Sequence, residues 1–129
     1  MLETGIKNTK SEVVVPENTA AAVGSGLLEV YATPQMIALI EGTAAASVME
    51  FLPEGDGTVG TSLNVKHLSA TPVGMTIRCE TELVEVDRRR LVFEAKVYDD
   101  AGLVGEGIHE RFIIHNEPFM EKALAKKNS

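Results

Sequence analysis

The sequence lacks the features that mark secreted, membrane and metal-cluster proteins. Cys79 is the only cysteine, so the chain can form neither an internal disulfide nor a cysteine metal cluster, and such usage is typical of the reducing cytoplasm. No apolar run approaches the roughly 18–20 residues of a membrane span. The N-terminal stretch MLETGIKNTKSE also lacks the apolar core of a signal peptide. The sequence therefore predicts a cytoplasmic protein with no membrane partner.

An excess of positive charge is missing as well. The formal net charge is −7, whereas a nucleic-acid-binding face needs lysine and arginine to neutralise phosphates. We therefore expect no nucleic-acid partner. The run DRRR at residues 87–90 is interpreted as a solvated hairpin turn; the alternative is a grip on the phosphates of a nucleotide-bearing ligand.

The composition that remains is that of an ordinary globular protein. Of the 129 residues, 44% are hydrophobic and 24% are charged, which are usual values for a folded domain of this size. We therefore expect one domain spanning residues 1–129.

The most apolar predicted helix runs from Pro34 to Leu52. Thr33 supplies a side-chain oxygen for the helix cap, and proline suits the first helical position. The helix is apolar on most sides, which indicates burial. Its central run GTAAAS consists of small residues that would let it lie close to a sheet. Gly42 weakens a helix by roughly 1 kcal/mol relative to alanine, so close packing is the expected reason for it.

After this helix the hydrophobic period changes to two, which predicts strands. The short connections TPVG, DRR and DAG suit turns of an antiparallel meander. We predict an α+β fold in which a five-stranded antiparallel sheet wraps around one long buried helix, followed by a short C-terminal helix. The far face would need cover, which favours a homodimer or higher homo-oligomer. The five strands are expected at residues 11–15, 58–70, 75–86, 90–99 and 103–115.

Three residues form the candidate catalytic site: Thr33, Glu41 and His67. Strand alternation groups His67 with Val59, Thr61, Leu63 and Val65 on the face toward the helix, and puts Gly60, Ser62, Asn64 and Lys66 on the other. A carboxylate in an apolar helix needs a partner, and histidine is a natural one. Both residue types serve as bases or nucleophiles. A threonine hydroxyl beside a helix N-terminus can polarise a carbonyl. The set suits attack on an activated acyl group.

Each of these residues also has a plain structural interpretation. Thr33 is a helix cap, Glu41 lies on an exposed helix stripe, and His67 is a satisfied histidine at a strand end. The stretch HERFIIH places His109, Arg111 and His115 on one strand face. That face offers no carboxylate or cysteine, so we predict no metal site there.

Three stretches, YATPQMIALIEGTA, VGTSLNVKHLSATPVGMT and GEGIHERFIIH, resemble the hotdog-fold thioesterases similar to fluoroacetyl-CoA thioesterase. The spacings also agree with that family: 8 residues from Thr33 to Glu41, 26 to His67 and 44 to Arg111. The resemblance covers most of the chain from about residue 28 onward, and KHLSATPVGM is its most specific block.

The resemblance implies a hotdog fold, edge-to-edge pairing of two subunits and active sites near their interface. It places the catalytic threonine, glutamate and histidine of the family on Thr33, Glu41 and His67. A glycine close to the acyl group falls on Gly60, and the arginine of the HER stretch falls on Arg111. The implied reaction is hydrolysis of an acyl-CoA thioester, with no cofactor beyond the coenzyme A of the substrate. Glu41 would attack the carbonyl or activate water, and His67 would move protons.

One departure concerns the segment before Thr33, which in the fluoroacetyl enzyme is an aromatic-rich lid. Here it reads AAAVGSGLLEVYA, with Tyr31 as its only aromatic residue. This departure favours a general small-acyl-CoA thioesterase over a fluorine-selective one.

Two other hypotheses remain: a hotdog protein that binds acyl-CoA or another small ligand without turnover, and an acyl-chain dehydratase, whose Asp/His pair is not found here.

Overall fold

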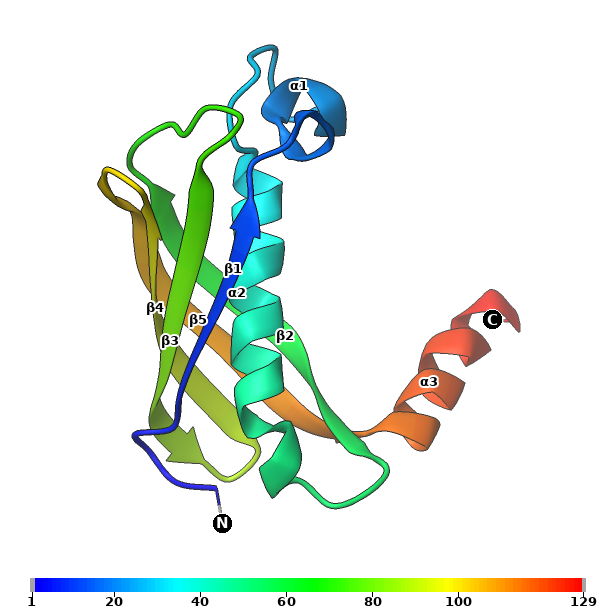
Figure 1. Ribbon diagram of the computed structural model, residues 1–129. Helices are drawn as coiled ribbons and strands as arrows, with labels where there is room; N and C mark the ends of the chain where they lie inside the picture. The colour runs from blue at the N-terminus through cyan, green and yellow to red at the C-terminus, as the bar shows by residue number, and fades with distance from the viewer. Residues whose placement is uncertain (1, 129) are drawn as a thin grey trace.

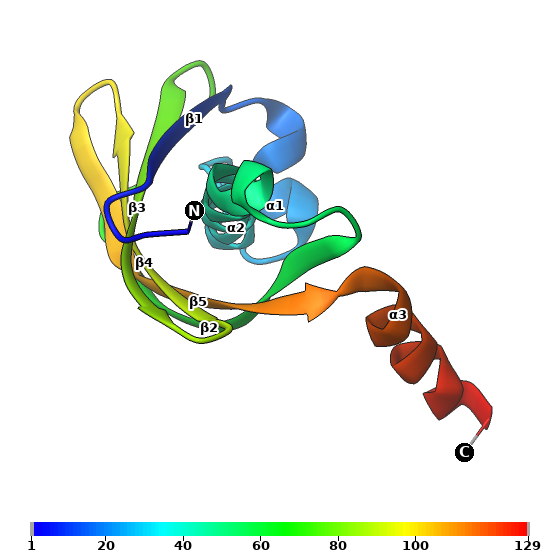
Figure 2. The same cartoon turned by 90° about the horizontal axis from the view of Figure 1, so that it is seen from below.

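Five antiparallel strands curve around one long helix (Figure 1). The computed structural model describes residues 2–128. Figure 2, viewed along the helix, shows the sheet wrapping around it. The predicted fold class is confirmed. In chain order the elements are β1 (Lys7–Val13), the short α1 (Ala20–Val23), α2 (Thr33–Val48), β2 (Asp56–His67), β3 (Thr76–Asp87), β4 (Arg90–Asp99), β5 (Gly102–His115) and α3 (Asn116–Ala125), with 3-10 turns at Pro16–Asn18, Met49–Phe51 and Lys126–Asn128.

The strand order is β1-β3-β4-β5-β2, so the prediction of a hairpin turn at TPVG is wrong. β2 pairs with β5 along its length, from Asp56 opposite His115 to His67 opposite Gly105. This pairing puts β2 at one edge of the sheet, away from β3. The segment between them crosses the end of α2, where the Thr71 carbonyl accepts a hydrogen bond from the Tyr31 amide at 2.8 Å.

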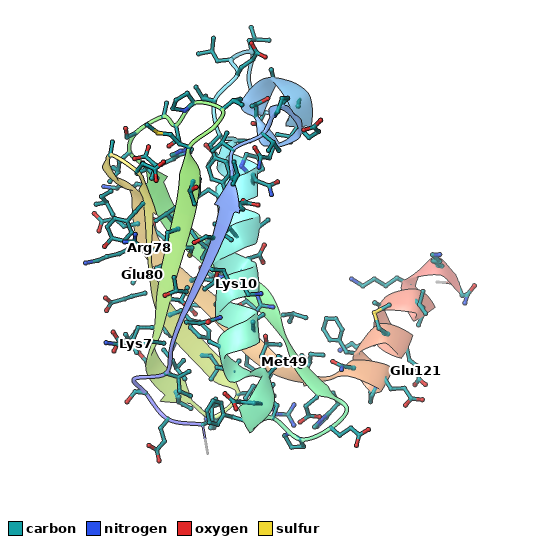
Figure 3. All side chains as sticks on the ribbon, in the orientation of Figure 1. Lys7, Lys10, Met49, Arg78, Glu80 and Glu121 are labelled. Carbon is teal, nitrogen blue, oxygen red and sulfur yellow. The ribbon has the colours of Figure 1, made fainter. Side chains whose placement is uncertain are left out.

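The first strand begins earlier than predicted. β1 covers Lys7–Val13 and pairs with β3 from Lys7 opposite Glu82 to Val13 opposite Thr76. Its residues are mostly polar and exposed, and Lys7 and Lys10 are labelled along it in Figure 3. Backbone pairing forms this edge strand, so a search for alternating apolar residues finds only its end.

Helix α2 covers Thr33–Val48 and continues as a 3-10 turn at Met49–Phe51, close to the predicted end. One face packs on the sheet in two clusters. Met36 and Ile40 join Ile77 and Val97 in the first; the second contains Ala44, Val48, Leu83, Leu91 and Phe93. The close-packing explanation of Gly42 is wrong, because an added Cβ there would meet no atom within 4 Å.

Two further predictions concern the ends of the sheet. Residues 88 and 89 form the exposed turn between β3 and β4, as predicted for DRRR. Arg90, at the start of β4, pairs with Glu85 and Glu110 at 2.8 Å each.

The predicted C-terminal helix is α3, which projects away from the sheet in Figures 1 and 2. None of the helices within residues 2–128 is long and apolar enough to cross a membrane.

Candidate active site

Thr33 and His67 meet where α2 begins and β2 ends. The helix cap is Ala32, and no side chain caps the helix. The Thr33 hydroxyl instead lies 2.7 Å from Nδ1 of His67. The prediction that Thr33 caps the helix is therefore wrong, because its hydroxyl is engaged with the imidazole. The prediction that His67 faces the helix is confirmed.

The second ring nitrogen of His67 is buried and has no hydrogen-bond partner among the described residues. Tyr31 packs edge-on against the ring, with 6.5 Å between the ring centroids. Burial lowers the pKa of His67 below its usual value, and the nearby Ser69 backbone opposes this only in part. An open cavity of about 260 Å³ adjoins the ring and is lined by Tyr31, Thr33, His67 and Leu68, among others. A buried nitrogen without a partner beside a cavity is a group available to a ligand.

Glu41 belongs to a second group, farther along α2. Its Oε2 lies 3.7 Å from Nη1 of Arg111, and its side chain is 39% exposed whereas that of Arg111 is 8% exposed. Gly60, on β2, completes the group. A Cβ added at Gly60 would lie 2.5 Å from Oε2 of Glu41 and 3.3 Å from Nη1 of Arg111. Only glycine leaves room for the carboxylate in this position.

A β-bulge explains why Gly60 faces the helix, contrary to the predicted alternation. The pairing of β2 with β5 shifts register between Gly60 and Ser62, so Thr61 is the extra residue. A bulge resets the alternation of side chains along the strand. Gly60 before it and Leu63 after it therefore both face α2, while Thr61, predicted to point inward, is exposed. Alternation of inward and outward side chains, if extended along the whole strand, therefore gives the wrong orientation for the residues before the bulge.

The five predicted site residues thus form two groups rather than one. Thr33 touches His67, and Glu41 touches Arg111 beside Gly60. Eight residues of helix separate Thr33 from Glu41, or about 12 Å along the axis at 1.5 Å per residue. Within one chain, Glu41 and His67 lie on the same side of the sheet without meeting.

Two residues around Arg111 were not predicted as parts of the site. Thr58 accepts hydrogen bonds from Arg111, at its hydroxyl (2.7 Å from Nε) and its carbonyl (2.9 Å from Nη2). His109 is fully buried, with Nε2 at 3.2 Å from Nη1 of Arg111. The alternation of β5 places His109 and Arg111 on one face and is the signal that could have found His109. No comparable signal marks Thr58.

The third histidine lies apart from both groups. His115, at the end of β5, pairs with Asp56 at 2.7 Å. Among residues 2–128, no three histidine, cysteine, aspartate or glutamate side chains gather in a way that could hold a metal ion.

Comparisons with known proteins point in one direction. The family model for fluoroacetyl-CoA-specific thioesterases matches residues 14–117. The fluoroacetyl-CoA thioesterase of Streptantibioticus cattleyicolor is 38% identical over 98 residues, which cover 76% of this chain and 70% of that protein.

Solved structures agree. A fluoroacetyl-CoA thioesterase structure superposes with a TM-score of 0.93 at 32% identity, over 98% of each chain. A variant of such an enzyme in complex with fluoroacetate and CoA reaches a TM-score of 0.87 at 33% identity, over 92% of this chain and 99% of the other. A thioesterase superfamily member from Thermus thermophilus reaches 0.90 at 25% identity, over 98% of this chain and 93% of the other.

Proposed function

The chain belongs to the fluoroacetyl-CoA-specific thioesterase family, and from this membership we propose that it hydrolyses small-acyl-CoA thioesters to the carboxylic acid and free CoA. The observation that carries the proposal is the position of His67. Thr33 holds one ring nitrogen at 2.7 Å, and the other is buried without a partner among the described residues, beside a cavity. This leaves an imidazole poised to exchange a proton with a ligand.

We propose further that the working site is shared between two copies of the chain. β2 is an edge strand, so its outer backbone groups are free to pair with another strand. If two β2 strands pair antiparallel about a point between Leu63 and Asn64, residue 60 of one chain lies opposite residue 67 of the other. That register brings the partner's His67 beside Glu41. It joins the two groups that a single chain keeps apart.

In this site the thioester carbon would lie between Glu41 and the Thr33–His67 pair. Glu41 attacks the carbonyl carbon, or takes a proton from a water molecule that does so. The carbon–sulfur bond breaks, and the sulfur leaves as the thiolate of CoA. Neutral His67 accepts the proton that the attacking water releases, directly or through Glu41, and passes it to this thiolate. The Thr33 hydroxyl and the start of α2 orient the carbonyl oxygen. Water supplies the hydroxyl of the acid.

Gly60 and Arg111 complete the proposed site. Gly60 leaves room for the Glu41 carboxylate against β2, and Arg111 places its positive charge next to that carboxylate. The proposed position of the acyl group is beside these residues. The coenzyme A of the substrate is the only cofactor that this reaction needs. The proposed setting is the reducing cytoplasm, supported by the single, buried Cys79.

Free-thiol release from a panel of acyl-CoAs, from acetyl to long-chain and including fluoroacetyl, tests the proposed function. We expect turnover of short acyl groups. We expect acetyl-CoA and fluoroacetyl-CoA to differ by less than about tenfold, because the segment before Thr33 holds the exposed Leu27 and Leu28 and one aromatic residue rather than several. A folded protein that binds CoA and releases no thiol from any member would instead be a binding module.

The pH dependence of kcat/KM is expected to follow the neutral form of His67. Burial holds the pKa of His67 below its ordinary value of 6.5. A protonated imidazole cannot accept a proton, so the rate falls only as the pH drops through that lowered pKa, and it stays level around neutrality. Rates of the wild type and of His67→Gln between pH 5 and 8 measure this. An acid limb centred above the ordinary histidine value, or one that survives in His67→Gln, would contradict it.

A further inference from the structure

His109 lies behind the Glu41 group and carries none of the roles described so far. It sits on β5 with no exposed surface. Its ring stacks on Phe93 with 6.3 Å between centroids and 30° between planes. Both ring nitrogens have partners: Nδ1 lies 2.9 Å from the Ser62 carbonyl oxygen, and Nε2 lies 3.2 Å from Nη1 of Arg111.

These two partners determine where the ring carries its proton. A carbonyl oxygen only accepts hydrogen bonds, so Nδ1 of His109 must carry a hydrogen. A guanidinium only donates, so Nε2 must present its lone pair to Arg111. The ring is therefore the neutral tautomer with hydrogen on Nδ1. A doubly protonated ring would set an N–H against the N–H of Arg111.

The electrostatic surroundings favour the same state. Burial lowers the pKa of His109, and the charge of Arg111 acts in the same direction. The hydrogen bond to the Ser62 carbonyl and the charges of Glu41 and Glu110 act in the opposite direction, but burial is the largest influence. The lone pair on Nε2 is therefore available at neutral pH.

His109 ties the bulge of β2 to the guanidinium. Ser62 is the residue at which β2 resumes regular pairing after the bulge. Arg111 is held by Thr58 through Nε and Nη2. Its Nη1 is left for His109 at 3.2 Å and Glu41 at 3.7 Å. The bond to His109 thus fixes the nitrogen that faces the carboxylate.

We propose that His109 is a positioning residue: as the neutral Nδ1–H tautomer it accepts a hydrogen bond from Arg111 and so sets the guanidinium that holds Glu41. The proposal rests on the proposed function, in which Glu41 performs the chemistry. It assigns to the HER stretch a second member that acts through Arg111.

The protonation state can be measured without any substrate. Long-range ¹H–¹⁵N correlation spectra of the ¹⁵N-labelled protein at neutral pH should show His109 with hydrogen on Nδ1 and none on Nε2. His115, with more than half of its side chain exposed, serves as the internal comparator. A His109 ring with hydrogen on Nε2, or on both nitrogens, would overturn the proposal even if the protein proved an active thioesterase.

Two substitutions separate the two hydrogen bonds of His109. In His109→Asn the amide can still donate to the Ser62 carbonyl but is too short to reach Arg111, whereas the longer side chain of His109→Gln can offer its oxygen to Arg111. We expect kcat to fall roughly 10- to 100-fold in the Asn variant, the usual effect of losing a hydrogen bond to a charged group, with KM little changed. The Gln variant should keep most of kcat.

His115→Asn, the same change on the same strand, is the matched control and should leave kcat unchanged. Thermal unfolding identifies a variant that does not fold. In that case the proposal is tested only by the wild-type spectra, which show on which nitrogen His109 carries its hydrogen. If folded Asn and Gln variants lose kcat equally, or neither loses it, His109 does not act through Arg111.

Discussion

Replacing Glu41 with glutamine is expected to lower kcat for thioester hydrolysis by roughly 10²- to 10⁴-fold, the usual contribution of a positioned acid or base. The amide cannot attack the carbonyl or take a proton from water, yet it matches the carboxylate in shape. The fold should tolerate the change. The Glu41 side chain is 39% exposed and lies 3.7 Å from the buried Arg111, whose hydrogen bonds to Thr58 and His109 do not depend on the carboxylate.

The measurement is thiol release by wild type and Glu41→Gln with the fastest acyl-CoA of the panel. Glu50→Gln is the matched control, because Glu50 is an exposed glutamate in the 3-10 turn directly after α2. Glu50→Gln should keep the wild-type rate. If Glu41→Gln also kept it, Glu41 would have no part in the chemistry, and the carboxylate would be only a surface group of an apolar helix.

The fold was largely predictable from periodicity, because burial on one face of each strand enforces the pattern. β3, β4 and β5 begin and end within one residue of the predicted ranges. β1 was missed for most of its length, since a polar edge strand forms by backbone pairing. The position of β2 at the far edge of the sheet could not be predicted from the sequence either. A short connection such as TPVG can join two paired strands of a hairpin, or it can cross the end of the helix to a strand that is not a neighbour.

The site was predictable in its residues but not in its geometry. The structure brings Thr33 and His67 into contact. Glu41 pairs with Arg111 because of a β-bulge, and no local sequence motif in β2 predicts that bulge. One extra residue at Thr61 turns Gly60 toward the helix. The separation of the two groups follows from helical rise alone and could have been worked out from the eight-residue spacing. This separation is the observation that supports the proposed site shared between two chains.

Recovery of activity in mixed dimers is the second large effect that we expect. Glu41→Gln and His67→Gln should each be nearly inactive alone. In a shared site, Thr33 and His67 come from one chain, and Glu41 comes from the other. A dimer of one variant with the other therefore holds one doubly defective site and one intact site. Co-expression in equal amounts makes half of the dimers mixed, so about one quarter of the wild-type activity should return if subunits pair at random.

The control is a mixture of Thr33→Ala and His67→Gln, which are altered in the same half of the site. Every site in any dimer of these two chains carries a defect, so no activity should return. Differently tagged subunits and sequential affinity purification isolate the mixed dimers, in which one of two sites is intact. If the Glu41→Gln and His67→Gln mixture stays as inactive as its parents while mixed dimers are present, each site lies within one chain. The 12 Å that helical rise puts between Thr33 and Glu41 would then have to close by a movement of β2 against α2. The bulge at Thr61, which now holds Gly60 beside Glu41, is the place where such a movement would have to occur.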